Sequence, residues 1–456
     1  MNVFWHQRDL RIRDNRGLAA AAADDTVVPV FVVDPAVRRA VGDRQWAFWT
    51  NGLRTLRGEY RERGSDLLVR VGDPATTLSA VAEEFDADRV YYNEHYRPTR
   101  RERQREVDEA VPTEAVTDLV LVDPATLDAR YENHSRFYDD WQAREKPAPA
   151  PTPGPDAVAD ISDPQALPDA EADIDLPAPG YDAARARWDR FLADGIESYS
   201  DTRDDMAAAV SRPERAVSRV SAYLAAGMLG IRELWADATD RYRAVDGDAR
   251  RNVDKYRYEL SWREQNYNLL YHHPSLPTEN YRRFPEAIDW ENDPETLAAW
   301  KRGETGYPLV DAGMRQLNAE GYIHNRPRQN VASFLTKHLL VDWREGLRYF
   351  EQQLLDHDPA NNAANWQWTA STGTDSVDVR IFDPVAQLSK YDDGADYVTA
   401  YVPELRGVPP GDIVDWPTRS AAERDRLAPE YPDPIVDRNA AYERAQRVFE
   451  RALGKR

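Results

Sequence analysis

The chain has 456 residues, enough for two or three domains with cores of their own. It carries 80 acidic and 59 basic residues for a formal charge of −21, and only six of the basic residues are lysine, a balance typical of proteins adapted to a high-salt cytoplasm. The absence of cysteine excludes disulfides, thiolate catalysis and cysteine-ligated metal sites, no apolar run approaches the roughly 20 residues of a membrane span, and the charged N-terminus does not resemble a signal peptide.

Residues 1–131 alternate short apolar runs with charged stretches of helical spacing. Strands are predicted over 2–5, 27–33, 67–71, 89–92 and 116–121, and helices over 44–63 and 74–85. This alternation predicts an α/β domain with a doubly wound, mostly parallel sheet. The turn after the first strand lacks the Gly-rich pattern of dinucleotide-binding folds.

Residues 132–190 are predicted to be a linker, because prolines alternate with small residues over 147–155 and an acidic stretch follows. Beyond this linker the strand signals nearly vanish. Apolar residues recur at helical spacing over 219–243, 251–272, 307–321, 328–341 and 343–357. We therefore predict an all-α domain over 191–456.

The predicted helix 251–272 carries a polar and aromatic stripe. Glu259, Trp262, Arg263 and Asn266 stand at i, i+3, i+4 and i+7, on one face. A carboxylate, an indole and a guanidinium are costly to bury together without partners. As the wall of a pocket they offer a hydrogen bond, a stacking surface and a phosphate contact, and the alternative is a solvated helix face.

Two segments have the composition of anion sites at helix starts. His324-Asn-Arg-Pro-Arg-Gln329 opens a predicted helix, and its arginines suit a phosphate or pyrophosphate. Ser218-Arg-Val-Ser221 places hydroxyls and free N–H groups before another helix. An ordinary exposed helix cap is the alternative in both segments.

Two indoles lie close together in the segment Trp366-Gln-Trp-Thr-Ala-Ser-Thr-Gly-Thr374, shortly after the carboxylates Asp356 and Asp358. In a polar, turn-forming segment, they offer flat surfaces to an aromatic cofactor or an unstacked base. Ordinary core packing is the alternative. Net charge argues against a nucleic-acid partner, but it does not report a local arginine cluster.

Distinctive motifs extend along the rest of the chain. They are Phe4-Trp-His-Gln-Arg-Asp-Leu-Arg-Ile-Arg-Asp-Asn15, Gly303-Glu-Thr-Gly-Tyr-Pro-Leu-Val-Asp-Ala-Gly-Met-Arg-Gln-Leu317, Ala332-Ser-Phe-Leu-Thr-Lys337, Asp342-Trp-Arg-Glu-Gly346 and Trp366-Gln-Trp-Thr-Ala-Ser-Thr-Gly-Thr-Asp375. With His324-Asn-Arg-Pro-Arg328, they resemble the photolyase/cryptochrome family over nearly the whole chain. The resemblance implies an α/β antenna-type domain joined to a helical FAD domain.

The resemblance also implies which residues bind FAD: Tyr199, Ser218, Ser221, Arg263, Arg328, Asp356, Asp358 and Asn362. Within this set the two serines are expected at the phosphates, and Arg328 is expected to pair with Asp356 beside the flavin. Asp358 is expected to contact the isoalloxazine ring. Asn362 is expected to face flavin N5, where repair enzymes of the family carry Asn and signalling members carry Asp or Cys.

Further roles follow from the same resemblance. Electron transfer from the surface to the flavin is assigned to Trp366, Trp343 and Trp290, although ordinary core packing is the alternative for each indole. The lesion pocket is assigned to Glu259, Trp262, Asn325, Trp368 and Gln329, with the indoles as walls and the polar groups on the pyrimidine edges. Arg326 and Arg380 are expected at DNA phosphates. No metal is required.

Several positions depart from the family pattern. Gln329 stands where dimer photolyases usually carry Met, which resembles the DASH cryptochromes, yet Trp368 stands where those proteins usually carry Tyr. The pair 266–267 reads Asn-Tyr where Tyr-Arg is common. Thr99 and Arg100 replace an Asn-Glu pair that binds folate in some relatives, so both the presence and the identity of a second, antenna chromophore stay open, with a deazaflavin and a folate as the alternatives.

We therefore expect light-driven repair of cyclobutane pyrimidine dimers, by electron transfer from excited reduced FAD to a dimer flipped out of DNA. A cytoplasmic monomer is expected. The alternative is a cryptochrome-type blue-light photoreceptor with little or no repair activity. Two features favour repair: Asn362, and the end of the chain soon after the last predicted helix, 439–456, which leaves no long regulatory tail. Gln329 and the altered pair at 266–267 favour the photoreceptor.

Overall fold

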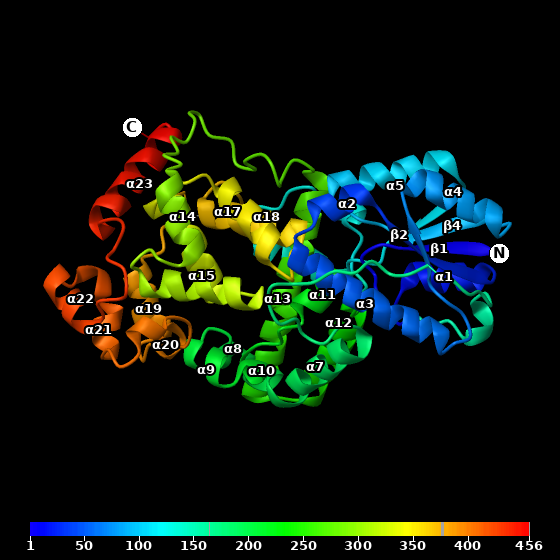
Figure 1. Cartoon of the computed structure of the whole chain (residues 1–456), viewed down its shortest axis with the longest axis horizontal. Coiled ribbons are helices and arrows are strands. Elements are labelled where there is room, and N and C mark those ends of the chain that lie inside the picture. Colours follow the sequence, from blue (N-terminus) through cyan, green and yellow to red (C-terminus); the bar gives the residue numbers. More distant parts are fainter. Residues whose placement is uncertain (164, 375–377, 456) are drawn as a thin grey trace. The chain divides into compact units, whose positions relative to one another are not determined.

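The computed structural model describes residues 1–163, 165–374 and 378–455 and divides into two compact units (Figure 1). The first unit comprises 1–197, 218–275 and 355–360, and the second comprises 198–217, 276–354 and 361–456. The boundaries of the predicted domains, at residues 131 and 190, stay a prediction.

The first unit is built on a five-stranded parallel sheet with the order β3-β2-β1-β4-β5. The strands are β1 (Asn2–His6), β2 (Val27–Val33), β3 (Leu68–Val71), β4 (Arg89–Asn93) and β5 (Thr113–Val116). Every residue of β1 and β2 is buried, as expected for central strands covered on both faces. The predicted α/β class is confirmed. The strand order reverses between β1 and β4, so the segments that follow these two strands lie next to each other at the carboxyl edge of the sheet.

Five helices surround the sheet (Figure 1): α1 (Arg16–Asp24), α2 (Pro35–Ala40), α3 (Asp43–Arg61), α4 (Pro74–Glu84) and α5 (Pro98–Ala110). On one face, Val3 and Trp5 pack with residues of α4 and α5. On the opposite face, the amide of Asn2 donates to the carbonyl of Ala21 in α1, and His6 is hydrogen-bonded to Tyr60 of α3. The alternation of side chains along β1 thus binds a helical layer on each face.

The prediction of a strand over 116–121 is wrong, because β5 ends at Val116. The backbone N–H groups of Leu121 and Val122 donate to Oε2 of Glu264, at 2.7 and 3.3 Å. Glu264 belongs to α13 (Gly247–His272) and is 3 % exposed. Since this buried carboxylate accepts the donors that a strand partner would need, the apolar run packs in the core as a loop.

The predicted helix 219–243 is two helices, α11 (Ser221–Ala226) and α12 (Ile231–Ala244). The break begins at Gly227, whose φ is +67°. A Cβ atom at this position would lie 1.8 Å from the carbonyl oxygen of Arg8, in the segment after β1. Only glycine permits both this conformation and this approach. The apolar spacing continues through the break, which is why the pattern did not reveal it.

The Pro-rich and acidic segment after α6 (His134–Ala143) belongs to the first unit and has little regular structure where it is described. The N–H of Ala159 donates to the carbonyl of Val27 at 2.9 Å, and Arg44 pairs with Asp173 at 2.6 Å. The segment leads into α7 (Tyr181–Asp194). These contacts fasten it to β2 and α3.

The described residues of the second unit form helices and loops without strands. Its helices are α8 (Tyr199–Thr202), α9 (Met206–Ser211), α10 (Pro213–Ala216), α14 (Pro294–Arg302), α15 (Pro308–Glu320), α16 (Asn325–Ser333), α17 (Trp343–Gln353), α18 (Pro359–Ala370, from its third residue), α19 (Pro384–Tyr391), α20 (Asp396–Tyr401), α21 (Pro410–Val414), α22 (Ala421–Leu427) and α23 (Arg438–Ala452). Among the described residues, no helix is long and apolar enough to cross a membrane.

Two predicted helices of this unit differ in extent. The helix predicted over 328–341 begins earlier, at Asn325, and changes to a π-helical turn over Phe334–His338. The helix predicted over 343–357 ends at Gln353. The predicted helical character of the second half is confirmed.

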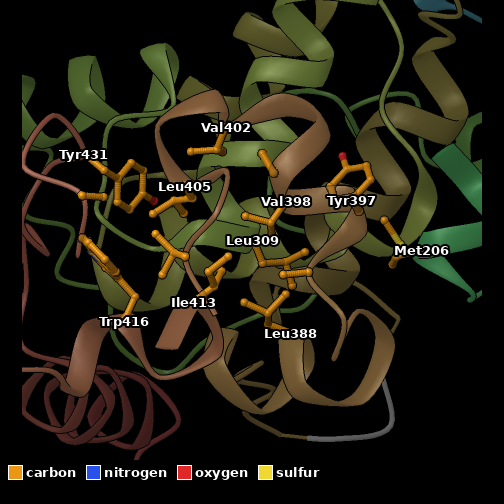
Figure 2. Packing of buried hydrophobic residues seen from close by; sticks show 14 residues of the cluster. Met206, Leu309, Leu388, Tyr397, Val398, Val402, Leu405, Ile413, Trp416 and Tyr431 are labelled. Carbon is orange, nitrogen blue, oxygen red and sulfur yellow. The ribbon is translucent and has the colours of Figure 1, made fainter. Parts of the chain in front are cut away.

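Figure 2 shows a core cluster that fastens α15 to α20 and to the C-terminal segment, with Leu309, Tyr397, Val398 and Tyr431 among its buried residues. A fully buried carboxylate, Asp311, lies in α15 and contacts one residue of this cluster, Tyr431. The hydroxyl of Tyr431 donates to Asp311 Oδ2 at 2.5 Å. Burial raises the pKa of Asp311 to about 6.

Candidate active site

Helix α13 presents the predicted stripe at the boundary between core and solvent. Glu259, Trp262 and Arg263 are each partly buried, so the stripe is neither a closed core face nor a fully solvated one. Glu259 Oε1 lies 2.6 Å from Lys255 Nζ, one turn earlier. Arg263 Nη2 donates to the carbonyl of Leu119 at 2.9 Å, and its Nη1 donates to Glu264 Oε1 at 3.0 Å.

Asp358 is the centre of a buried polar cluster in the first unit. Its Oδ2 accepts a hydrogen bond from Arg8 Nη2 at 3.0 Å and another from the hydroxyl of Tyr267. Asp358 and Arg8 are both 6 % exposed. Burial alone would lower the pKa of Arg8, but Tyr267 and Asp358 raise it above its ordinary value. The cluster therefore keeps a compensated negative charge at Asp358.

His95 extends this cluster toward the sheet. It follows β4, and its Nε2 lies 3.2 Å from Arg8 Nη1. Burial and the neighbouring Arg100 and Arg8 hold the pKa of His95 well below its ordinary value. The imidazole is therefore neutral, and its Nε2 lies within hydrogen-bond distance of the guanidinium. The edge where β1 and β4 end thus supplies the cation that compensates Asp358.

The predicted phosphate segment lies just before α11. The hydroxyl of Tyr256 donates to Ser218 Oγ at 3.1 Å, and Arg187 Nε donates to the Ser218 carbonyl at 2.7 Å. Ser221 is the first residue of α11, and no side chain caps that helix. Both serines are partly buried. The segment thus retains polar groups at a helix start, as predicted.

The second unit contains a pocket between α16, α17 and α18, lined by Asn325, Arg328, Gln329, Ala332, Phe350, Asn361, Asn362, Asn365, Trp366 and Thr369. Its lining combines side-chain amides with an indole, a phenyl ring and a guanidinium. It brings together residues with three predicted roles. Asn325 and Gln329 belong to the predicted lesion pocket, Arg328 and Asn362 to the predicted flavin site, and Trp366 to the predicted electron-transfer chain. Such a lining offers both stacking and hydrogen bonding to a flat, polar ligand.

Trp366 and Trp368 lie on α18, which ends at Ala370. The prediction that both indoles lie in a turn-forming segment is therefore wrong, since the turn begins only at Ser371. Trp366 is 2 % exposed and packs on α17, where a Cβ atom at Gly346 would lie 2.1 Å from its ring. Trp343 stands one turn before Gly346 and donates from Nε1 to Asn280 Oδ1 at 2.9 Å. Trp366 is therefore held against α17, and Trp343, which belongs to α17, is held by its hydrogen bond to Asn280.

The remaining predicted residues of the second unit lie at its surface or close to it. Arg326 Nη2 pairs with Asp204 Oδ1 at 2.8 Å, and its Nη1 donates to Gln329 Oε1 at 3.0 Å. The guanidinium of Arg380 lies 4.6 Å from the ring centroid of Trp368. Trp290 is half-buried against the ring of Phe449, at 5.7 Å, and Tyr199 is half-buried in α8.

The predicted residues are thus divided between the two units. The first unit holds Ser218, Ser221, Glu259, Trp262, Arg263, Asp356 and Asp358, and the second holds Tyr199, Trp290, Asn325, Arg326, Arg328, Gln329, Trp343, Asn362, Trp366, Trp368 and Arg380. The sequence interpretation did not include Arg8 and His95. An arginine and a histidine two residues after the ends of two buried strands are the signal that could have identified them, because parallel strands present such residues at one edge.

A second cavity lies in the first unit near the ends of β1 and β2. Its lining residues are Trp5, His6, Gln7, Phe31, Val32, Asp34, Val37, Trp46, Trp49, Pro74, Arg100 and Arg103. Within the described part of the chain, the indole N–H of Trp49 has no hydrogen-bond acceptor although the residue is 4 % exposed. Burial and the neighbouring Arg8, Arg97 and Arg103 lower the pKa of Arg100 to about 9.

Comparison with known proteins identifies the family. Residues 2–156 match the model of DNA photolyase, and residues 256–451 match the FAD binding domain of DNA photolyase. A deoxyribodipyrimidine photo-lyase of Halobacterium salinarum is 44% identical, over 100% of both chains. The chain belongs to the photolyase/cryptochrome family. FAD is therefore its cofactor, and the amide-rich cavity and the charge-compensated Asp358 suit a flavin.

Solved photolyase structures have the same fold. A bacterial class III photolyase from Agrobacterium tumefaciens is 32% identical with a TM-score of 0.87, covering 100% of this chain and 98% of its own. An archaeal photolyase from Sulfolobus tokodaii, described with two FAD molecules, is 30% identical with a TM-score of 0.83, covering 99% and 100%. The predicted combination of an α/β domain and a helical FAD-binding domain is confirmed.

The Arg8–Asp358 pair generates a prediction about stability. Arg8→Leu leaves a buried carboxylate without its cation and should lower the free energy of unfolding by about 3–5 kcal/mol. Asp358→Asn in the Arg8→Leu background should recover part of this loss, because the uncompensated charge disappears. Chemical denaturation at high salt, arranged as a double-mutant cycle, measures the coupling.

The matched control is Arg243→Leu, which removes the exposed Arg243–Asp240 pair of α12. It should change stability by no more than about 0.5 kcal/mol. Equal effects of Arg8→Leu and Arg243→Leu would contradict the assignment of Arg8 as the compensating charge.

Proposed function

We propose that this chain is a deoxyribodipyrimidine photo-lyase, which uses light to split cyclobutane pyrimidine dimers in DNA. The observation that carries this function is full-length identity of 44% to an enzyme of that name, combined with an FAD-binding domain of the photolyase type. We further expect it to act as a monomer in the cytoplasm, on DNA that contains such dimers.

The flavin site is assigned to the residues that the family resemblance implies for FAD. The chemistry that bound FAD supplies is donation of one electron under illumination. Asp358, paired with Arg8 and hydrogen-bonded by Tyr267, provides a fixed carboxylate for the ring system. Arg328 and Asn362 line the amide-rich cavity, where they can offer a cation and a polar amide to a flavin ring. Ser218 and Ser221, just before α11 and at its first residue, are suited to the phosphates.

The lesion pocket is assigned to Glu259, Trp262, Asn325, Trp368 and Gln329. Flipping a dimer out of the duplex costs a few kcal/mol, and stacking on an indole returns about 1–3 kcal/mol per base. Trp262 and Trp368 are both half-buried, which leaves part of each indole accessible. Glu259 and the exposed amide of Asn325 can meet the pyrimidine edges.

DNA phosphates are assigned to Arg326 and Arg380. Because Arg326 is paired with Asp204 and hydrogen-bonded to Gln329, a phosphate would replace a carboxylate as its partner. This exchange suits a salt-adapted protein, since counterion release contributes little at molar salt. Positioning of the strand is then the main role of these arginines.

We propose that the second chromophore binds in the cavity at the ends of β1 and β2. The tryptophans of its wall offer stacking surfaces, and Trp49 has an unused N–H donor. Arg100 is a buried cation among other cations, so an anionic group would stabilise it. A planar, anionic chromophore fits these features. Of the two alternatives, a deazaflavin is favoured, because Thr99 and Arg100 replace the folate-binding pair.

Repair itself is tested with a thymine-dimer oligonucleotide, mixed with photoreduced protein at high salt and then illuminated or kept dark. Chromatography should detect the return of intact thymines only in the light. Glu259→Ala should lower the repair rate about tenfold or more, because one preorganised polar group is lost, while FAD content is unchanged. Bound, photoreducible flavin without any repair by the wild-type protein would favour the photoreceptor alternative.

Glu345→Ala is the control for the glutamate, since Glu345 is also helical and pairs with a basic residue one turn away, Arg348. It should leave repair unchanged. Loss of FAD from the Glu259 variant would show that this residue faces the cofactor and not the dimer.

Trp366→Phe should slow the photoreduction of oxidised FAD, because phenylalanine is far harder to oxidise than an indole. Absorption of the flavin under blue light, with an external reductant, measures the rate. Trp416→Phe is the matched control, since Trp416 is fully buried in the core cluster of Figure 2. Equal photoreduction in the Trp366 and Trp416 variants would rule out electron transfer through Trp366.

Arg100→Leu should reduce binding of a deazaflavin while the catalytic FAD is retained. Titration of the holoprotein with 8-hydroxy-5-deazariboflavin, and separately with added FAD, measures the affinity of the cavity by energy transfer to the resident flavin. Arg105→Leu, an exposed change on the same helix α5, is the control. Identical affinities for the two variants would place the second chromophore elsewhere.

A further inference from the structure

His134 covers one face of Trp262. The imidazole and the indole are stacked, with ring centroids 3.6 Å apart and planes inclined by 6°. His134 is the first residue of α6 and is 7 % exposed. The ring of Tyr258 packs edge-on against the imidazole at 4.9 Å. His134 is therefore inserted between two aromatic residues of α13.

Both nitrogens of the imidazole are hydrogen-bonded to α13. Nε2 lies 3.0 Å from Ser261 Oγ, and Nδ1 lies 2.6 Å from Gln265 Oε1. Ser261 directly precedes Trp262 and Gln265 follows it by one turn, so the ring is fixed to the helix that carries the indole. Burial lowers the pKa of His134 to about 4, which leaves the ring uncharged at neutral pH.

We propose that His134 is a positioning residue for dimer binding: it holds the indole of Trp262 in one orientation and leaves the opposite face for the pyrimidine dimer. An indole on a half-exposed helix face otherwise has several rotamers. Fixing one of them before binding removes an ordering cost from the binding step. The inference rests on the proposed function, because it requires Trp262 to be a wall of the lesion pocket.

A purely structural role for His134 makes a different prediction. A buried histidine that only fills the core would affect stability when replaced, without changing the preference for damaged over undamaged DNA. His134→Leu and His134→Phe separate the two roles. Both changes fill the site and lose the hydrogen bonds to Ser261 and Gln265, but only phenylalanine keeps a flat ring against the indole.

The experiment measures, in the dark and at high salt, the affinity of the FAD-loaded variants for an oligonucleotide with one thymine dimer and for its undamaged counterpart. Trp262→Ala should weaken dimer binding about tenfold or more. His134→Leu should weaken it about fivefold, and His134→Phe should stay within about twofold of wild type. His338→Leu is the matched control, because His338 is 1 % exposed and stacks on Phe334 in the second unit.

Each result decides a separate question. Wild-type dimer affinity in Trp262→Ala would refute the proposed lesion wall itself. A weakened Trp262→Ala together with an unchanged His134→Leu would overturn the inference and leave the proposed function intact. Equal losses in His134→Leu and His134→Phe, or in His134→Leu and His338→Leu, would assign the effect to hydrogen bonding or general stability, which also overturns it. The expected order of affinities would support the positioning role.

Discussion

Compensation of buried charge at the carboxyl edge of the parallel sheet is the constraint on which the first unit depends. Arg8 pairs with Asp358, and Arg232 pairs with Asp14 and Asp118, all nearly inaccessible to solvent. A buried guanidinium is tolerated only when a carboxylate or carbonyl partner is fixed beside it. These pairs therefore determine where the segments that follow α10 and α17 can lie against the strands. The hydrogen bond and ion pair with Arg8 likewise set the charge environment of Asp358.

Arg100 shows what happens at this edge when burial and neighbouring cations outweigh the nearby carboxylate of Asp34. Its pKa falls to about 9, whereas that of Arg8, beside Asp358, rises. Both arginines are buried, so the difference comes from the charges around them. Arg8 is part of the completed framework of the protein. Arg100 has the properties of a residue whose anionic partner is a ligand, which is the physical basis for assigning a chromophore to the cavity beside it.

The sequence predicted the class of both halves, most strands and the chemical types in the site, because these depend on local periodicity and on motifs. The prediction was wrong where a contact with a residue far along the chain determines the local structure. The strand predicted to Leu121 ends at Val116 because Glu264, far along the chain, accepts its backbone donors. The break at Gly227 reflects the approach of the Arg8 carbonyl. Arg8 and His134 are single residues without a local pattern, so their partners appear only in three dimensions.

An acidic surface and a DNA substrate place opposite demands on this chain, and the aromatic residues of α13 reconcile them. At molar salt, contacts between arginine and phosphate lose much of their counterion-release contribution, whereas stacking on an indole is far less sensitive to salt. Recognition of a damaged base must then depend more on how well the stacking surface is prepared. A neutral imidazole, held by two hydrogen bonds behind Trp262, prepares that surface without adding a charge that salt would screen. Salt adaptation therefore increases the importance of the support that His134 gives to Trp262.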